Sequence, residues 1–333
     1  MDLENRISLM LELAKMMKSR DPQWMEAKTR ACQINPWFTP GFIDLAVENI
    51  VSCYLQRDLL EQWTRSAGIP GEQKDPRQIG VVMAGNIPLV GFHDFLSVFI
   101  SGHRQLIKLS SKDRELMTAI LQFIHLARPE TETAIQTAEM LKGCDGYIAT
   151  GSNNTARYFD YYFGKFPSLI RRNRTSAAIL NGKESREELE NLADDVHRYF
   201  GLGCRNVTKI FVPENYDFVP LLEAFRKYHW MTEQHRYKNN YDYRLSLAIL
   251  NKQYYMTNES ILLLEEESLF SPISVLHYAF YQPGNPVIAA DLSDSIQCLV
   301  GKDFIPFGKS QQPSLTDYAD GSDTLLFLRN LNG

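Results

Sequence analysis

Apolar and polar positions recur at helical spacing along the first part of the chain. A first helix is expected to carry its apolar side chains on one face: Leu9, Leu13, Met16 and Met17. From Phe42 to Ala67, apolar residues recur at intervals of three and four, which predicts one long helix ending before Gly68. Residues 1–75 are therefore expected to form an N-terminal helical region.

The pattern changes at Ile79, where short apolar runs begin to alternate with amphipathic segments. The runs predicted as strands are 79–83, 105–109, 147–150, 175–180, 208–212, 275–281, 298–300 and a terminal strand at 323–328. The segments predicted as helices include 90–101, 113–126, 187–200, 217–229 and 243–250. Continuous apolar runs are typical of strands buried on both faces of a parallel sheet, so this alternation predicts an α/β fold.

Composition narrows the class of protein. The chain has 333 residues and a formal net charge of -5, so a basic surface for nucleic acid is not expected. Its five cysteines form no CxxC pair and its seven histidines show no ligand spacing, which disfavours a disulfide framework and a metal site. The N-terminus lacks a signal-peptide pattern, and no apolar run approaches the roughly 20 residues of a membrane span. We therefore expect a cytoplasmic protein with no membrane span.

Cys204 is the best candidate for a nucleophile. It lies between a glycine-rich turn and an apolar run, in the segment 201–212, GLGCRNVTKIFV. The thiolate is the reactive form of cysteine, and the cation of Arg205 would favour it. The alternative is a small buried side chain in a turn, and local composition alone favours that alternative. His197 is expected to be a surface or packing residue, because two glycines break the helical register between it and the thiol.

Three further turns follow predicted strands. The side-chain amide of Asn86, fixed at a strand end, can donate a hydrogen bond to an oxyanion. Lys108 ends another strand and can bind ribose or phosphate, while Gly151-Ser152 open a helix whose backbone amides can hold a pyrophosphate. Taken singly, each is more simply explained as an ordinary turn or a solvated strand end. No GxGxxG or GxxxxGK[ST] motif is present, so neither a standard dinucleotide turn nor a P-loop is indicated.

Taken in order along the chain, these pieces resemble the motifs of the aldehyde dehydrogenase superfamily. The matching segments are Asn86-Ile-Pro88 (Asn-x-Pro), 106–110 (Val-x-Lys-x-Ser), 150–152 (Thr-Gly-Ser), Cys204 seven residues before Phe211-Val212, and 306–310 (the Pro-Phe-Gly turn). The resemblance extends from Ile79 to Phe327. More narrowly, the chain resembles the acyl-CoA reductase branch of this superfamily, the family of the fatty-acid reductase of bacterial bioluminescence.

The resemblance implies a fold of two doubly wound parallel-sheet domains, with an active site between them. A nucleotide-binding domain is expected over 76–171, joined by part of 301–333, and a catalytic domain over 172–300. The resemblance also assigns roles, with Cys204 as the nucleophile and Asn86 as the oxyanion donor. The residues that it implies for cofactor binding are Lys108, Ser110, Ser111, Gly151, Ser152 and Glu267.

Departures from the superfamily pattern shape the expected chemistry. The glutamate that activates the deacylating water in hydrolytic relatives is replaced by Ile170, so a thioester on Cys204 is expected to resist hydrolysis. The acidic residue that commonly selects NAD is replaced by Ser111 with Lys112 beside it, so NADPH is favoured and NADH remains possible. Glu267 stands one position early for the Glu-x-Phe motif that holds the nicotinamide ribose, which weakens its assignment.

The expected reaction is therefore reduction of an acyl-CoA to an aldehyde through an acyl group on Cys204. Two alternatives stay open. One is an acyltransferase that forms the same adduct and passes it to another thiol, and the other is a non-catalytic binding protein. The resemblance also implies two possible partners. One is a second copy of the chain, in a homodimer, and the other is an acyl-activating enzyme.

Overall fold

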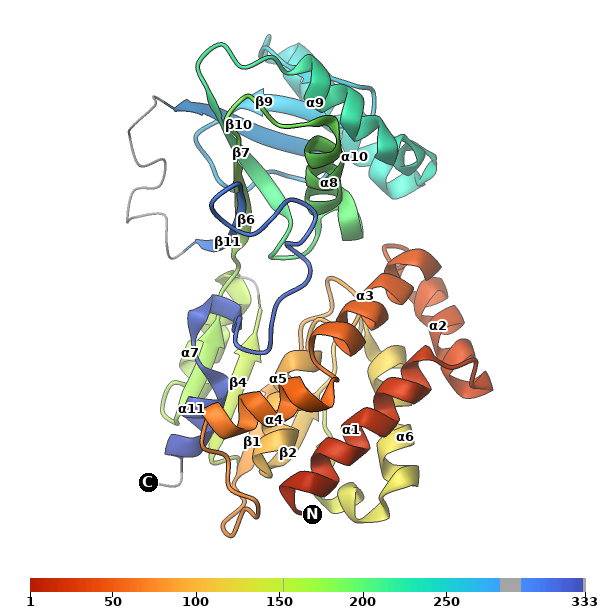
Figure 1. Ribbon diagram of the computed structural model, residues 1–333, viewed down its shortest axis with the longest axis vertical. Helices are drawn as coiled ribbons and strands as arrows, with labels where there is room; N and C mark the ends of the chain where they lie inside the picture. The colour runs from red at the N-terminus through yellow and green to blue at the C-terminus, as the bar shows by residue number, and fades with distance from the viewer. Residues whose placement is uncertain (152, 282–294, 332–333) are drawn as a thin grey trace. The chain divides into compact units, whose positions relative to one another are not determined.

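The computed structural model describes residues 1–151, 153–281 and 295–331. The chain divides into two units, each built around its own sheet (Figure 1). Unit 1 comprises Met1–Asn173 and Pro313–Gly333, and unit 2 comprises Arg174–Gln312. The predicted position Ser152 lies outside the described residues.

Four helices open unit 1: α1 (Leu3–Lys18), α2 (Pro22–Ile34), α3 (Pro40–Cys53) and α4 (Arg57–Ser66). The single helix predicted over 42–67 is wrong, because the chain turns between α3 and α4. Leu55, in that turn, is buried at 1% exposure, and the Gln56 side chain donates a hydrogen bond to the backbone oxygen of Val51 at 2.7 Å. The turn lets both helices direct apolar side chains into one core, which a straight helix of that length would not do.

Sheet A of unit 1 is entirely parallel, with the strand order β3-β2-β1-β4-β5. Its strands are β1 (Gln78–Val82), β2 (Arg104–Lys108), β3 (Ile135–Thr137), β4 (Gly146–Thr150) and β5 (Ser168–Arg171). The helices that connect them are α5 (Phe92–Ser101), α6 (Arg114–Ala127) and α7 (Asn153–Phe163), with a 3-10 turn η1 (Pro129–Thr133). The strand order reverses direction between β1 and β4, which is where ligands bind in open parallel sheets.

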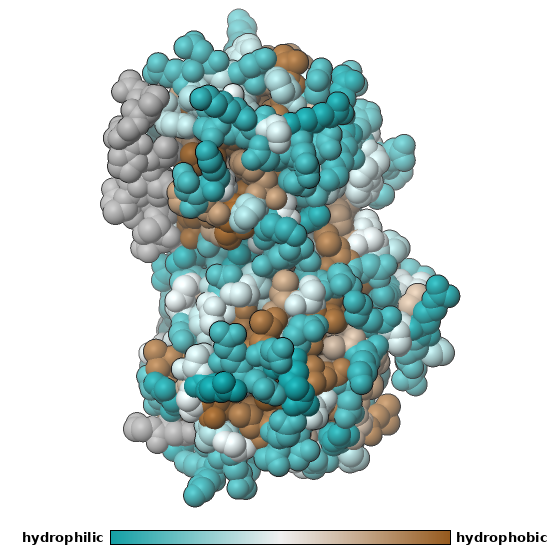
Figure 2. All heavy atoms as spheres, in the orientation of Figure 1, coloured by the Kyte–Doolittle hydropathy of each residue, from teal (hydrophilic) through white to brown (hydrophobic). Residues whose placement is uncertain are grey.

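The N-terminal helices and sheet A share one hydrophobic core. Leu13 of α1 and Trp63 of α4 belong to the same cluster of buried side chains as Ile79 of β1 and Phe95 of α5. On the face drawn in Figure 2, hydrophilic residues predominate and apolar residues lie exposed between them. The N-terminal helices are therefore an integral layer of unit 1.

The terminal strand predicted over 323–328 is wrong, because the segment is helix α11 (Thr324–Asn330). Asp323 caps it by accepting a hydrogen bond from the Leu326 N–H at 2.9 Å. Leu325 and Leu328 are both fully buried, and a spacing of three residues places them on one helical face against α5. The short 3-10 turn η5 (Ala319–Gly321) precedes this helix.

Sheet B of unit 2 has the order β11-β6-β7-β10-β9-β8; among its described strands, β8 alone runs antiparallel to its neighbour. Its strands are β6 (Thr175–Ile179), β7 (Val207–Pro213), β8 (Met256–Thr257), β9 (Leu262–Glu265), β10 (Val275–Tyr281) and β11 (Ile296–Gly301). The helices in the described part of unit 2 are α8 (Arg186–His197), η2 (Arg198–Gly201), α9 (Val219–Ala224), η3 (Phe225–Glu233) and α10 (His235–Leu250). Among the described residues, no helix is long and apolar enough to cross a membrane.

Candidate active site

Cys204 lies in a turn that leads from helix α8 into strand β7. The helix predicted to reach Phe200 ends at His197, because Tyr199, Phe200 and Gly201 adopt positive φ values of 55°, 56° and 74°. Left-handed backbone at two non-glycine residues is unfavourable and persists only when surrounding contacts hold it. Tyr199 and Phe200 are buried at 4% and 2% exposure, so core packing fixes the backbone that carries Cys204.

The side chain of Asn206 stabilises this turn through hydrogen bonds. This side chain is fully buried, and its Oδ1 accepts a hydrogen bond from the Gly203 N–H at 2.8 Å. Its Nδ2 lies within hydrogen-bond distance of three backbone oxygens, those of Asp195 at 3.0 Å, Val196 at 3.3 Å and Arg198 at 2.8 Å. This one amide thus satisfies backbone groups of the segment 195–203, which precedes Cys204, and holds the turn rigid.

Asp195 ties the turn to a segment more than a hundred residues away. Its carboxylate accepts hydrogen bonds from the backbone N–H groups of Gly308 at 2.6 Å and Ser310 at 3.0 Å. Burial raises the pKa of Asp195, and these hydrogen bonds oppose that shift. Arg198 adds a further bond to the backbone oxygen of Gly308 at 3.1 Å. The predicted 306–310 turn therefore packs against the end of α8, beside the Cys204 turn.

A second cysteine lies close to Cys204. The Ser176 hydroxyl donates to the backbone oxygen of Cys204 at 3.1 Å and contacts the Cys298 sulfur at 3.0 Å. Burial raises the pKa of Cys298, while the nearby Arg205 guanidinium acts to lower it. Cys204 is itself partly exposed and forms no disulfide. Of these two neighbouring thiols, Cys204 is the one on the turn that the sequence predicts to be reactive.

His197 is a packing residue, one of the two roles predicted for it. It is 2% exposed, stacks on the ring of Tyr228 with centroids 4.8 Å apart, and lies edge-on to Phe225. Its Nδ1 is hydrogen-bonded to the backbone oxygen of Ala193 at 2.9 Å, which requires the proton on Nδ1. Burial lowers the pKa of His197 to about 4, so the ring is neutral at physiological pH.

Glu267 lies in an exposed loop after β9, and this loop turns back across sheet B. Buried Lys209 donates to the backbone oxygen of Glu266, and His277 Nδ1 bonds the backbone oxygen of Ser268 at 2.9 Å. Near the start of β7, the Thr208 hydroxyl donates to the backbone oxygen of Leu269 at 2.6 Å. The loop that carries Glu267 is therefore fixed over the sheet and leads toward the strand that begins after Cys204.

Asn86, Lys108 and Gly151 lie at the same edge of sheet A. Asn86 follows β1, Lys108 ends β2, and Gly151 follows β4. These strands are parallel neighbours, so their carboxyl ends meet at one edge, and the β1–β4 pair is the point where the strand order reverses. Three positions taken from separate motifs thus come together in unit 1, whereas Cys204 and Glu267 belong to unit 2.

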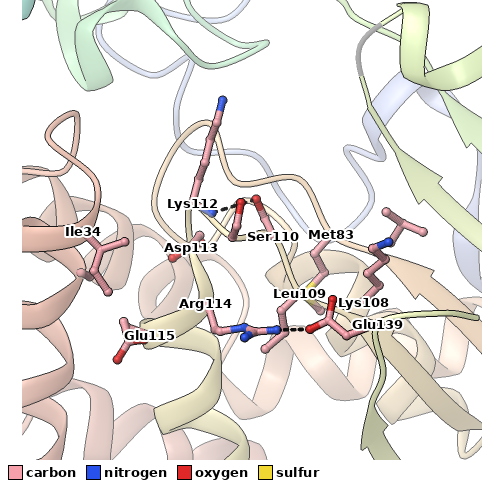
Figure 3. Close-up of a pocket in the computed structure, with 13 residues that line it drawn as sticks. Ile34, Met83, Lys108, Leu109, Ser110, Lys112, Asp113, Arg114, Glu115 and Glu139 are labelled. Carbon is pink, nitrogen blue, oxygen red and sulfur yellow. Dashed lines mark hydrogen bonds and ion pairs between the residues drawn. The ribbon is translucent and has the colours of Figure 1, made fainter.

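A pocket of about 540 Å³ opens beside this edge (Figure 3). It is lined by Ala31, Ile34, Val82, Met83, Lys108, Leu109, Ser110, Ser111, Lys112, Asp113, Arg114, Glu115 and Glu139. Three of the predicted cofactor-binding residues, Lys108, Ser110 and Ser111, are therefore in its wall. Helix α2 supplies an apolar wall through Ile34, which the sequence did not indicate.

The charges of the pocket suit an anionic ligand that also carries hydroxyl groups. Arg114 forms an ion pair with Glu139, and in Figure 3 the Lys112 side chain extends away from that pair. The turn is anchored from α2, because Asn35 donates to the backbone oxygen of Lys112 at 3.1 Å. A volume of this size falls in the range of small-molecule sites, and the start of α6 adds backbone N–H groups. The residues present thus fit the ribose and phosphate of a nucleotide.

The residues that build the site through long-range bonds were missed by the sequence analysis. Asp195 and Asp113 were not predicted, since their partners lie elsewhere in the chain. Asn206 was also missed, although its partners lie within 11 residues of it. One signal was available for α8, where Asp194 and Asp195 occupy the last turn. Acidic residues are unfavourable at a helix C-terminus, so their presence there indicates a specific partner. Among the described residues, no group of three or more potential ligands could hold a metal ion.

Comparison with known proteins identifies the fold. Neither a protein-family model nor a curated protein matches the chain. An aldehyde dehydrogenase from Bacillus cereus aligns with a TM-score of 0.64 at 13% identity, covering 90% of this chain and 72% of that one. Succinic semialdehyde dehydrogenase from Streptococcus pyogenes, in complex with NADP+, aligns with a TM-score of 0.62 at 14% identity, covering 90% and 76%. An NADP-dependent enzyme from E. coli aligns with a TM-score of 0.61 at 11% identity, covering 90% and 72%.

At these identities the matches establish the fold. The chain has the α/β fold of aldehyde dehydrogenases, with two parallel-sheet units and N-terminal helices. The fold class predicted from the ordered motifs is therefore confirmed. The matched structures do not distinguish the acyl-CoA reductase branch from the rest of the superfamily.

Proposed function

We propose that this chain is a nicotinamide-dependent oxidoreductase acting at the aldehyde level, and more narrowly an acyl-CoA reductase that uses NADPH. The observation that carries the proposal is the Cys204 turn. A partly exposed cysteine is held by Asn206 and by packed left-handed backbone, in a fold shared with NADP-dependent aldehyde dehydrogenases. Strain and buried hydrogen bonds concentrated around one cysteine are typical of a nucleophile that must be held in position.

In this proposal the Cys204 thiolate attacks the carbonyl carbon of an acyl-CoA. A carbon–sulfur bond forms to Cys204, the bond to the CoA sulfur breaks, and CoA leaves as a thiol after taking a proton from solvent. Arg205 supports the thiolate by its charge, since a neighbouring cation favours the ionised form. The side-chain amide of Asn86 and the backbone amide of Cys204 are assigned as donors to the tetrahedral oxyanion.

The fate of the acyl group depends on what surrounds it. Hydrolytic relatives use a glutamate at the position of Ile170, and the segment 168–174, SLIRRNR, contains no carboxylate. Ile170 lies in β5 and pairs with Ala149 of β4. Its side chain is aliphatic and cannot act as a base. Without a general base to activate water, the thioester is expected to persist until it is reduced or exchanged with a thiol.

The proposed cofactor would be held at the edge of sheet A. Lys108, Ser110 and Ser111 would bind the adenosine ribose, and Lys112 would attract a 2′-phosphate. Gly151, with Ser152, would approach the pyrophosphate, and Glu267 would contact the nicotinamide ribose. When bound, NADPH supplies the hydride that converts the acyl group to the aldehyde and is itself oxidised to NADP+.

The test combines intact mass with cofactor oxidation. Purified chain is incubated with acetyl-, octanoyl- or palmitoyl-CoA, first without and then with NADPH or NADH. We expect one acyl group to add per chain without cofactor, and NADPH oxidation with aldehyde formation when cofactor is present. Cys204→Ala should abolish both, while Cys298→Ser should keep the adduct.

Other outcomes separate the alternatives. An adduct that exchanges with added thiols but never supports NADPH oxidation would indicate an acyltransferase. An unmodified chain across the whole panel would contradict the proposal and favour a binding protein. Retention of the adduct in Cys204→Ala, with its loss in Cys298→Ser, would move the nucleophile to the neighbouring cysteine.

A further inference from the structure

Two turns meet at the carboxyl edge of sheet A. One follows β1 and carries Asn86, over residues 83–91, and the other follows β2 and forms the pocket wall, over 109–113. β1 and β2 are hydrogen-bonded neighbours, and the Met83 N–H continues the ladder to the backbone oxygen of Lys108 at 3.1 Å. The two turns therefore start side by side. The contacts between them fix the position of the turn that carries Asn86.

Asp113 bridges the two turns. Its Oδ2 accepts a hydrogen bond from the Leu89 N–H at 2.6 Å, across 24 residues of sequence. Leu89 is 2% exposed and has a φ of 57°, a left-handed conformation that a leucine adopts only under constraint. Without the carboxyl, that buried N–H would lose its hydrogen bond and the strained turn would lose its brace.

The turn after β1 and the turn after β2 are also in close steric contact. A Cβ placed on Gly85 would lie 2.4 Å from the Ser110 Oγ and 2.7 Å from the Ser110 Cβ. Gly85 does not have a positive φ, so glycine is needed here for close approach and not for backbone conformation. The turn that carries Asn86 thus rests directly on the turn that lines the pocket.

Asp113 is buried at 4% exposure, and its Oδ1 has no hydrogen-bond partner among the described residues. Burial raises its pKa to about 8, and the Leu89 N–H bond opposes that shift. The facing turn, residues 84–91, contains no titratable side chain, and the Asn35 side chain from α2 is neutral. The charged side chains around the pocket are Lys108, Lys112, Arg114, Glu115 and Glu139. The carboxyl is therefore mostly protonated at physiological pH, which suits a buried group with one unsatisfied oxygen.

We propose that Asp113 is a positioning residue that fixes the Asn86 turn and couples it to the nucleotide pocket. The inference rests on the proposed function, in which Asn86 donates to the oxyanion. Asp113 acts through the Leu89 N–H and does not touch the reacting atoms itself. Ionisation of the buried carboxyl at alkaline pH draws water to it and loosens the junction between the turns.

The test measures acylation of Cys204 by the acyl-CoA that modifies the wild type fastest, without NADPH, by quenched intact mass. We expect Asp113→Ala to slow acylation about tenfold, as the loss of one positioning hydrogen bond implies. Asp113→Asn keeps an oxygen acceptor for Leu89 and should stay within about threefold of the wild type. The ratio of the Asp113→Asn rate to the wild-type rate should rise as the pH passes about 8, because only the wild type ionises there.

The matched control is Asp145, which accepts a hydrogen bond from the Gln78 N–H at 2.7 Å at the opposite end of β1. Asp145→Ala removes the same kind of bond and should leave acylation within about twofold of the wild type. Gly85→Ala perturbs the junction from the other turn and covers the case in which Asp113→Ala does not fold. It should slow acylation, and Ser110→Gly in the same chain should restore the rate.

A folded Asp113→Ala variant that acylates at the wild-type rate would overturn the role proposed for Asp113 and would leave the proposed function standing. So would a ratio that does not change with pH, or a Gly85→Ala chain that acylates normally. Absence of any adduct on the wild type would overturn the proposed function, and the role of Asp113 with it.

Discussion

The side-chain amide of Asn206 donates to the backbone oxygen of Arg198 at 2.8 Å and so closes the loop that carries Cys204. The same side chain accepts from the Gly203 N–H, so one residue bonds both before and after the end of α8. A turn held in this way does not need the substrate to order it. Rigidity of this kind lowers the cost of placing a nucleophile against a carbonyl carbon.

Replacing Asn206 by alanine should therefore destabilise the chain and slow its acylation. Several buried backbone groups would lose their partner, and we expect a loss of about 2–4 kcal/mol in the free energy of unfolding. Urea denaturation followed by circular dichroism measures this loss. The control is Asn239→Ala, an exposed asparagine on α10, which should change stability by less than about 0.5 kcal/mol. Equal effects of the two substitutions would contradict the bracing role of Asn206.

A carboxylate at position 111 should change cofactor preference. Ser111 lines the pocket beside Lys112, and Ser111→Glu places a negative charge where a 2′-phosphate is expected. We expect the KM for NADPH to rise about tenfold relative to that for NADH, from like-charge repulsion. Steady-state kinetics with both cofactors measures the ratio, and Ser52→Glu on α3 controls for the added charge. An unchanged ratio would remove position 111 from cofactor selection.

The buried ion pair between Arg171 and Asp94 should be needed for the stability of unit 1. The two side chains are 3% and 6% exposed, and Arg171 also donates to the Thr324 hydroxyl at 2.6 Å. Asp94→Ala leaves the buried Arg171 charge with the longer ion pair to Asp320 at 3.6 Å, so the substitution should cost about 3 kcal/mol of unfolding free energy. Arg171→Met in the same chain should recover part of that loss, because replacing a whole buried pair by apolar groups is often tolerated.

The exposed pair of Arg186 and Glu190 provides the comparison for that experiment. Its side chains are 87% and 40% exposed at a separation of 2.9 Å. Glu190→Ala should leave the free energy of unfolding essentially unchanged, because solvent-exposed pairs contribute little. Thermal or urea denaturation of both variants compares them directly. If Asp94→Ala is as mild as Glu190→Ala, the buried pair is not a stabilising element.

The elements predicted correctly are those with a strong local signal. Strand β10 was predicted at its observed bounds, 275–281, because a continuous apolar run is typical of a buried parallel strand. Strands β3, β5, β8 and β9 were missed, and β3 and β8 have only three and two residues. The segment 323–328 was predicted as a strand because its leucines form a run, although their burial follows helical spacing.

The residues of the candidate site also divide into those with a local sequence signal and those without one. Lys108, Ser110 and Ser111 are contiguous in sequence, so a motif was enough to predict them, and they line one pocket. Asp113 and Asp195 act through backbone N–H groups 24 and more than a hundred residues away. No local pattern encodes such bonds, because only the folded sheets bring the partners together.

Neutral, buried His197 should make the chain sensitive to acid. Burial lowers its pKa to about 4, whereas a histidine in the unfolded chain titrates near 6.5. Between these values the unfolded chain binds a proton that the folded chain does not, so the free energy of unfolding falls as the pH drops from about 6.5 to about 4. The slope from this one residue is at most about 1.4 kcal/mol per pH unit.

His197→Phe keeps an aromatic ring against Tyr228 and removes the titration. At pH 7.5 the variant should be less stable than the wild type by about 1 kcal/mol, because the bond to the Ala193 oxygen is lost. By pH 4.5 the difference should shrink or reverse, since only the wild type bears the cost of the proton. His103 and His277, whose pKa values burial also lowers, are present in both proteins and cancel in the comparison. Urea denaturation at a series of pH values measures the difference, and a constant gap between the two proteins from pH 7.5 to 4.5 would show that His197 does not supply the acid sensitivity.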